Sequence, residues 1–174
     1  MRHSLRRNCA AVPDLNPPTP PLNVVLIEPQ IPPNTGNVAR LCSVTGVRLH
    51  LVGPLGFSVA DKDMRRAGLD YWFGLWKRLY GNLDEFLAEL SGEARLHLFT
   101  ARAKRSLWNV TFLPGDFLVF GSEPHGLPPS FLAARPGDQI GLPMLPNTRS
   151  LNLSNCVAVG VYEALRQLST DAVR

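Results

Sequence analysis

The stretch "LPMLPNTRSLNLSNCVAVGVYEALRQL", residues 142–168, decides how the rest of the chain is interpreted. A loop rich in amide and hydroxyl side chains runs directly into an apolar segment with helical spacing, which predicts a final helix over about 153–168. Asn152 or Ser154 can cap this helix, and one such residue is enough to begin a helix. The remaining polar side chains of the loop therefore predict a binding site at the start of the helix.

Strands and helices alternate over the chain that precedes this stretch. Apolar runs of strand length are separated by segments with helical spacing, which is typical of an α/β protein with a parallel sheet covered on both faces. Strands are expected in "NVVLIE" (23–28), "VRLHLVG" (47–53), "RLHLFT" (95–100), "DFLVFG" (116–121) and "DQIGLPM" (138–144), and helices in "NTGNVARLCSVTG" (34–46) and "NLDEFLAEL" (82–90).

Composition limits the class of protein. The chain has 174 residues, 45% of them hydrophobic, and a net charge of +4 with a pI near 9.3, which favours one domain and an anionic partner. No apolar run reaches the roughly 18 residues that span a bilayer. Three cysteines and four histidines have no ligand spacing, so we expect a reduced, cytoplasmic protein without a metal.

The first 21 residues differ from the rest of the chain. Five of residues 13–21 are proline, which disfavours a helix and removes backbone donors. We expect a disordered, passive extension over 1–21, although its arginines leave contact with RNA open, and a folded domain over 22–170.

A second polar stretch, "EPQIPPNTGNVAR", covers residues 28–40, where the first expected strand ends. Asn34 or Thr35 can cap the helix that follows, and Gly36 allows a close backbone approach, so the free N–H groups at the helix start can face an anion. A proline-rich turn with a good cap is the alternative interpretation.

A third stretch, "LVFGSEPHGLP", covers residues 118–128. Gly121 and Gly126 suit a loop that passes close to a ligand. Ser122 and His125 do not indicate a serine hydrolase, because the G-x-S-x-G motif is absent. Glu123 is either a functional carboxylate or an ordinary surface residue. All three stretches follow strands, and open α/β sheets bind ligands at the carboxyl ends of their strands.

The three stretches together resemble the motifs of SPOUT-class (SpoU-type) RNA 2′-O-methyltransferases. The resemblance covers residues 23–168 and is closest to the compact tRNA methyltransferases that modify the wobble cytidine or uridine of leucine tRNAs; "DKDMRRAGLDYW" (61–72) is also similar to that subgroup. The resemblance implies a parallel-sheet α/β knot, the SPOUT fold, with a C-terminal trefoil knot that periodicity alone does not predict.

The resemblance also implies S-adenosyl-L-methionine as cofactor and tRNA as substrate. The resemblance implies that Arg40 is the catalytic residue. Because arginine stays protonated and is a poor base, we expect it to contact the reacting ribose or its phosphate. The network around it comprises Asn34, Glu123, Ser150 and Asn152. The implied cofactor contacts are Phe99, Gly121, Leu142 and Ser150. The expected RNA contacts are Arg149, Arg65, Arg66 and Arg102. Where relatives have a glycine after the strand of Phe99, this chain has Ala103, so the resemblance does not predict the shape of that wall of the cofactor site.

The last helix predicts a homodimer. One face carries an apolar stripe, and Val159 and Tyr162 make the opposite face apolar too. Gly160 and Ala164, both on the stripe, are expected to keep neighbouring surfaces flat enough for close approach. A second copy of the chain is the simplest partner for the opposite face, and the resemblance implies a dimer as well.

Two other functions remain open at this point. One is 2′-O-methylation of another tRNA position or of ribosomal RNA; the short chain argues against ribosomal RNA, because many relatives that act on it carry an additional N-terminal domain. The other is a noncatalytic RNA-binding module of the same fold, against which the intact motif residues argue.

Overall fold

A six-stranded parallel sheet forms the centre of the protein. The structure, a computed structural model, describes residues 21–58, 77–146 and 148–171, so nearly all of the expected N-terminal extension lies outside the described residues. The strand order is β3-β2-β1-β5-β4-β6, and all five strand pairs are parallel. The strands are β1 (Asn23–Ile27), β2 (Arg48–Val52), β3 (Lys77–Tyr80), β4 (Leu96–Phe99), β5 (Phe117–Phe120) and β6 (Gln139–Ile140).

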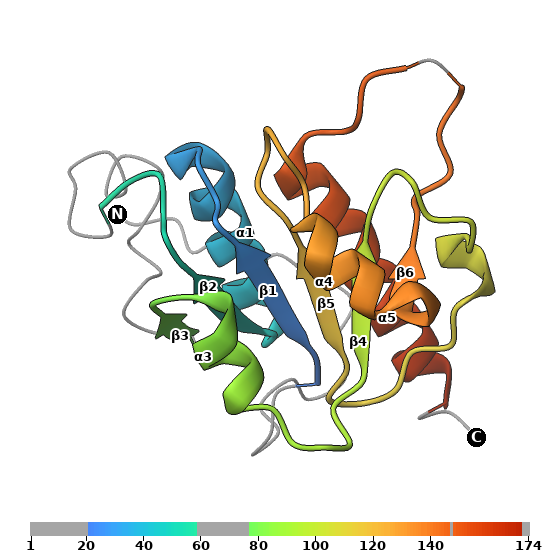
Figure 1. The fold of residues 1–174 in the computed structure, drawn as a ribbon. Coiled ribbons are helices and arrows are strands. Elements are labelled where there is room, and N and C mark those ends of the chain that lie inside the picture. The colour runs from blue at the N-terminus through green and yellow to red at the C-terminus, as the bar shows by residue number, and fades with distance from the viewer. Residues whose placement is uncertain (1–20, 59–76, 147, 172–174) are drawn as a thin grey trace, which may run out of the picture.

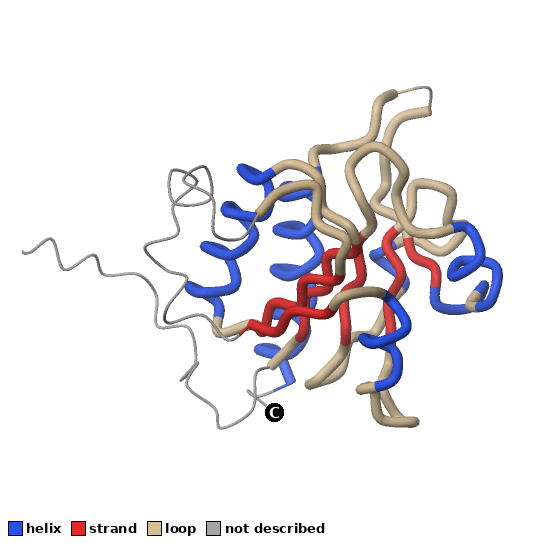
Figure 2. Tube along the Cα trace, turned by 60° about the vertical axis from the view of Figure 1, so that its left-hand side comes forward, coloured by secondary structure: helices blue, strands red, loops and turns tan. Residues whose placement is uncertain are grey.

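Helices cover both faces of the sheet (Figures 1 and 2). The helices are α1 (Pro32–Thr45), α3 (Leu83–Ala88), α4 (Pro129–Ala134) and α5 (Leu153–Asp171), and two short 3-10 helices are η2 (Leu107–Asn109) and η3 (Pro136–Asp138). Side chains of β1 alternate between two buried clusters, so Val24 and Leu26 pack with α1 and α5, whereas Val25 and Ile27 pack with α3 and α4. The expected parallel α/β architecture is confirmed.

Helix α5 buries the predicted stripe. Val157, Val161 and Ala164 are fully buried in the cluster beneath α1 and α5. The Oδ1 atom of Asn152 accepts a hydrogen bond from the backbone N–H of Ser154 at 2.9 Å, so Asn152 caps the helix as predicted. Gly160 and Ala164 belong to this stripe, as predicted, because a Cβ atom at Gly160 would lie 2.8 Å from the Phe99 ring and Ala164 is fully buried. Both residues face the protein's own core.

Helix α1 begins earlier than expected. Its N-cap is Ile31 and Pro32 is its first residue, so Asn34 and Thr35 lie inside the first turn and the prediction that either caps the helix was wrong. Proline suits the first helical position, since its missing N–H would have no partner there. The end at Gly46, with φ 71°, was predicted correctly.

Other differences concern short elements. Strand β3 was not predicted, because a four-residue edge strand shows too little alternation to be recognised. Helix α4 was not predicted either, and β6 covers only two of the seven residues expected to form a strand. No helix among the described residues is long and apolar enough to cross a membrane.

Candidate active site

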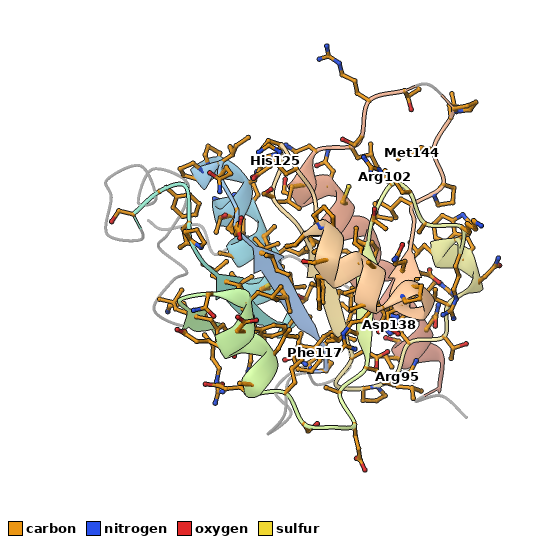
Figure 3. The ribbon with its side chains drawn as sticks, viewed as in Figure 1. Arg95, Arg102, Phe117, His125, Asp138 and Met144 are labelled. Carbon is orange, nitrogen blue, oxygen red and sulfur yellow. The ribbon has the colours of Figure 1, made fainter. Side chains whose placement is uncertain are left out.

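A cavity of about 720 Å³ lies at the carboxyl ends of β4, β5 and β6. The loops after these strands form its walls together with the first turns of α1 and α5 (Figure 1). Figure 3 shows His125, Arg102 and Met144, which line the cavity, at this end of the molecule, whereas Arg95 and Phe117 lie at the other end. The volume falls within the roughly 300–1,000 Å³ typical of small-molecule sites.

The loop after β5 can form only with glycine at its start. A Cβ atom on Gly121 would lie 1.9 Å from the carbonyl carbon of Gly126 and 2.1 Å from the nitrogen of Leu127. Ser122 and Gly126 exchange two backbone hydrogen bonds, at 3.1 and 2.8 Å, and Gly126 has a φ of 70°. The sequence therefore closes this loop tightly, and its tip, residues 122–126, forms one wall of the cavity.

Aromatic rings form an apolar part of the wall. Phe99 at the end of β4 and Phe120 at the end of β5 are stacked, with ring centroids 4.2 Å apart and an interplanar angle of 19°. Gly160 of α5 packs against the Phe99 ring from the core side. Because Phe99, Phe120 and Leu142 all line the cavity, it can bind a flat apolar group.

The carboxylate of Glu123 holds the first turn of α1. Its oxygens accept hydrogen bonds from the backbone N–H groups of Gln30 at 2.8 Å and Ile31 at 3.3 Å, and from Nδ2 of Asn34 at 2.9 Å. A carboxylate is favourable at this position, because the N-terminus of a helix carries a partial positive charge. The predicted anion at this helix start is thus supplied by the chain itself.

The network continues from Asn34 to the last helix. The Oδ1 atom of Asn34 accepts a hydrogen bond at 2.8 Å from Nδ2 of Asn152. The Oδ1 atom of Asn152 in turn accepts from the backbone N–H of Ser154 at 2.9 Å and from its hydroxyl at 2.7 Å. Each amide therefore has a defined orientation, and one chain of hydrogen bonds joins all three polar stretches in the wall of the cavity.

One thiol lies in the cavity wall. Cys156 lies in the first turn of α5, and partial burial raises the pKa of its thiol above the ordinary value. A thiol with a raised pKa stays protonated at neutral pH and is a weak nucleophile. Cys156 is therefore a wall residue that does not compete for an electrophile in the cavity.

The sequence of the folded region matches one protein family. A model of the SpoU rRNA Methylase family matches residues 21–162. The chain belongs to this family. This SpoU methylase is 53% identical over 147 residues to a tRNA (cytidine(34)-2'-O)-methyltransferase from Burkholderia ambifaria, an alignment that covers 83% of this chain and 94% of the relative.

Solved structures of other proteins share the fold of this SpoU methylase. One comes from work on the 2-OH methylation of C/U34 on tRNA; it has a TM-score of 0.82 and 45% identity, and the match covers 86% of this chain and 97% of that one. Another is the SpoU methyltransferase AviRb from Streptomyces viridochromogenes in complex with the cofactor AdoMet, with a TM-score of 0.74 and 22% identity over 88% of this chain and 60% of that one. At that identity the second likeness concerns the fold alone.

Most site residues predicted for this SpoU methylase lie around the cavity. Those that line it are Asn34, Phe99, Arg102, Gly121, Glu123, Leu142, Ser150 and Asn152. Arg40 lies exposed on α1 and Arg149 lies exposed in the loop before α5, and neither lines the cavity. Arg65 and Arg66 lie outside the described residues. The wall after β4 is present in spite of Ala103, since Thr100, Ala101 and Arg102 all line the cavity.

Several residues of the wall were not recognised from the sequence. Met144, Gln139, Leu132 and Cys156 also line the cavity of this SpoU methylase. Met144 and Cys156 lie within the stretch of residues 142–168, and Leu132 and Gln139 lie on the elements before it. Apolar residues such as Met144 and Leu132 look like core residues in a sequence. Among the described residues, no group of three or more histidine, cysteine, aspartate or glutamate side chains is arranged to hold a metal ion.

Proposed function

We propose that this chain is a tRNA 2′-O-methyltransferase that modifies the ribose of nucleotide 34, the wobble cytidine or uridine. Leucine tRNAs are its proposed substrates. The observation that carries the proposal is the hydrogen-bond network of Glu123, Asn34 and Asn152 in the wall of the cavity. The high identity to a tRNA (cytidine(34)-2'-O)-methyltransferase over 83% of the chain supports nucleotide 34 as the target. In this proposal the protein is cytoplasmic, and residues 22–170 form its methyltransferase domain.

The cavity suits S-adenosyl-L-methionine as methyl donor. This cofactor supplies an electrophilic methyl group on a sulfonium. Phe99 and Leu142 provide apolar wall for its adenine ring, and the tight turn at Gly121 brings main-chain groups to the cavity. Ser150 lies where the polar loop meets the cavity and provides a hydroxyl for the ribose part or the substrate.

The residues of the network position the RNA ribose. Asn34 and Asn152 are fixed by their hydrogen bonds, so they present defined polar groups without reorganising when RNA binds. Arg40 contacts the reacting ribose or its phosphate and favours loss of the 2′-hydroxyl proton through its charge. Arg149 and Arg102, both exposed, bind phosphates of the tRNA.

A homodimer explains why Arg40 lies outside the cavity of its own chain. Helix α5 is buried on its inner face, yet Val159 and Tyr162 on its outer face are 39% and 58% exposed. A second copy of the chain covers this apolar surface in our proposal and brings its cavity beside Arg40. The same proposal includes the knot, in which the 141–152 loop and α5 form the threaded C-terminal part.

Methyl transfer to tRNA is the direct test of this function. The protein is incubated with S-adenosylmethionine labelled in the methyl group and with total tRNA, the RNA is digested, and the nucleosides are identified by mass spectrometry. We expect 2′-O-methylated cytidine or uridine from position 34. Label only in another tRNA position or only in ribosomal RNA contradicts the proposed substrate, and RNA binding without label supports a noncatalytic module.

Light scattering tests the dimer. The unsubstituted chain is expected to have the mass of two copies. Replacing Val159 by Glu and Tyr162 by Asp introduces two charges into the apolar surface and is expected to give monomers with weak tRNA binding. A monomer mass for the unsubstituted chain at micromolar concentration contradicts the homodimer.

A further inference from the structure

A tryptophan lies exposed on the segment that leaves the cavity after β4. Thr100, Ala101 and Arg102 line the cavity, and the chain then runs past β6 to η2, drawn in yellow in Figure 1. Trp108 in η2 is 60% exposed. Tryptophan is large and highly buried on average, so this degree of exposure is unusual.

The backbone around Trp108 is held rigidly. The neighbouring Leu107 is fully buried and Val110 is 4% exposed, so the tryptophan side chain lies between two anchors. The N–H of Leu107 donates to the carbonyl of Gly141 at 2.8 Å, and the hydroxyl of Ser106 accepts from the N–H of Trp108 at 3.2 Å.

Helix α5 provides a further attachment of the same segment. Nε2 of Gln167 donates to the carbonyl of Val110 at 3.0 Å, and Oε1 of Gln167 accepts from the N–H of Phe112 at the same distance. With the strand-like bridge between Ser106 and Gly141, these bonds fix the segment to the sheet edge and to α5. The exposure of Trp108 is thus a property of an ordered turn.

The segment that carries Trp108 is cationic. Residues 102–105 read "RAKR", and the chain has neither aspartate nor glutamate between residues 94 and 115. Lys104 and Arg105 are exposed, and in the described part of the chain neither forms an ion pair with a carboxylate. Cations beside an exposed ring are the combination that binds unpaired nucleotides, because the ring stacks on a base while the cations contact phosphates.

We propose that Trp108 is a stacking platform for an unpaired base of the RNA substrate, with Lys104 and Arg105 contacting the phosphates beside it. The inference rests on the proposed function, since it concerns the RNA that reaches the cavity. Arg102 lines the cavity, and Trp108 follows six positions later on the same ordered segment. In this proposal the base that stacks on Trp108 is therefore near the methylated nucleotide in the RNA sequence.

The test measures tRNA binding and methyl transfer for three substitutions of Trp108. Trp108→Ala is expected to weaken tRNA binding about 5- to 150-fold, the range for removal of one stacked base. Trp108→Leu retains apolar surface without a ring and is expected to behave like Trp108→Ala, whereas Trp108→Phe retains most of the affinity. The KM for tRNA is expected to rise with little change in kcat, and S-adenosylhomocysteine binding stays the same.

Matched variants separate stacking from charge and from general apolar contact. Leu113→Ala, on the same segment and 44% exposed, is expected to bind tRNA like the unsubstituted chain. Lys104→Gln and Arg105→Gln are each expected to reduce the slope of log Kd against log salt by about 0.7 for every single-strand phosphate that the side chain neutralises.

The outcomes distinguish this inference from the proposed function. Equal tRNA affinity of Trp108→Ala and the unsubstituted chain overturns the inference and leaves the function standing. A change of mass in solution together with unchanged tRNA affinity also overturns it, and identifies the surface as a protein contact. Failure of the unsubstituted chain to bind tRNA overturns both.

Discussion

Removal of the Glu123 carboxylate tests whether the cavity depends on the contact between the β5 loop and α1. Glu123→Ala deletes an anion that accepts from the N–H groups of Gln30 and Ile31 and from Nδ2 of Asn34. Loss of the hydrogen bonds from Gln30 and Ile31, which lie just before α1, costs about 1 kcal/mol. Asn34 is 5% exposed, so leaving its amide unpaired adds about 2 kcal/mol.

The expected total of about 3 kcal/mol corresponds to a fall in melting temperature of about 6–12 °C for a domain of this size. Methyl transfer is expected to fall about 100-fold or more, because a displaced Asn34 also releases Asn152. Glu123→Gln keeps one acceptor oxygen without the charge. Its melting temperature and its methyl transfer are expected to lie between those of Glu123→Ala and those of the unsubstituted chain.

Thermal unfolding followed by circular dichroism and methyl transfer to tRNA provide the two measurements. Glu93→Gln is the matched control, since Glu93 is an exposed carboxylate in the turn before β4, away from the cavity, and its loss is expected to change neither value. A melting temperature for Glu123→Ala equal to that of the unsubstituted chain would show that the network contributes nothing to the stability of the fold, and the role given to Glu123 would be wrong.

Three further substitutions have defined outcomes. Gly121→Ala forces a Cβ atom into the backbone of Gly126 and is expected to abolish S-adenosylhomocysteine binding in calorimetry. The control Gly137→Ala, where a Cβ atom meets nothing within 4 Å, is expected to bind normally. Equal binding by both variants contradicts the tight turn at Gly121. Arg40→Ala is expected to lose methyl transfer and keep S-adenosylhomocysteine binding, because Arg40 does not line the cavity, and retained transfer would exclude its catalytic role. Burial, with the charges of two nearby arginines, lowers the pKa of His50 from 6.5 to about 4, so the unfolded chain takes up a proton first and stability falls as the pH drops from 6.5 to 4. The loss is about 3 kcal/mol, and His50→Gln is expected to flatten the pH dependence of urea unfolding in that interval.

The sequence predicts those parts of the fold whose signals are local. Strands β1 and β5 are recognisable because continuous apolar runs of strand length suit a sheet covered on both faces. Helix α5 is recognisable from its apolar stripe, and its start from Asn152. The edge strand β3 has no such signal, because its four residues are partly exposed and too few to show a period.

The errors concern contacts between residues that are distant in the sequence. Asn34 was expected to cap its own helix, since a cap is sought next to the helix it serves. The actual partner of α1 is Glu123, about 90 positions away. Gly160 was expected on the apolar stripe that covers the sheet and lies there, but the sequence did not identify the Phe99 ring as the neighbour that it meets. Residue types along the chain do not specify such pairs.

The hydrogen bond between Asn34 and Asn152 joins positions separated by 118 residues. Contacts of this span form only after the intervening chain has ordered, since closing a long loop costs entropy before the contact is made. During synthesis the β1 side of the cavity is made early, but it stays incomplete until the start of α5 has been added. A chain that stops before residue 152 is therefore expected to bind no S-adenosylhomocysteine, even where its first strands have paired. Ligand binding then reports that the whole domain has folded, and the ligand stabilises only chains that have reached that state.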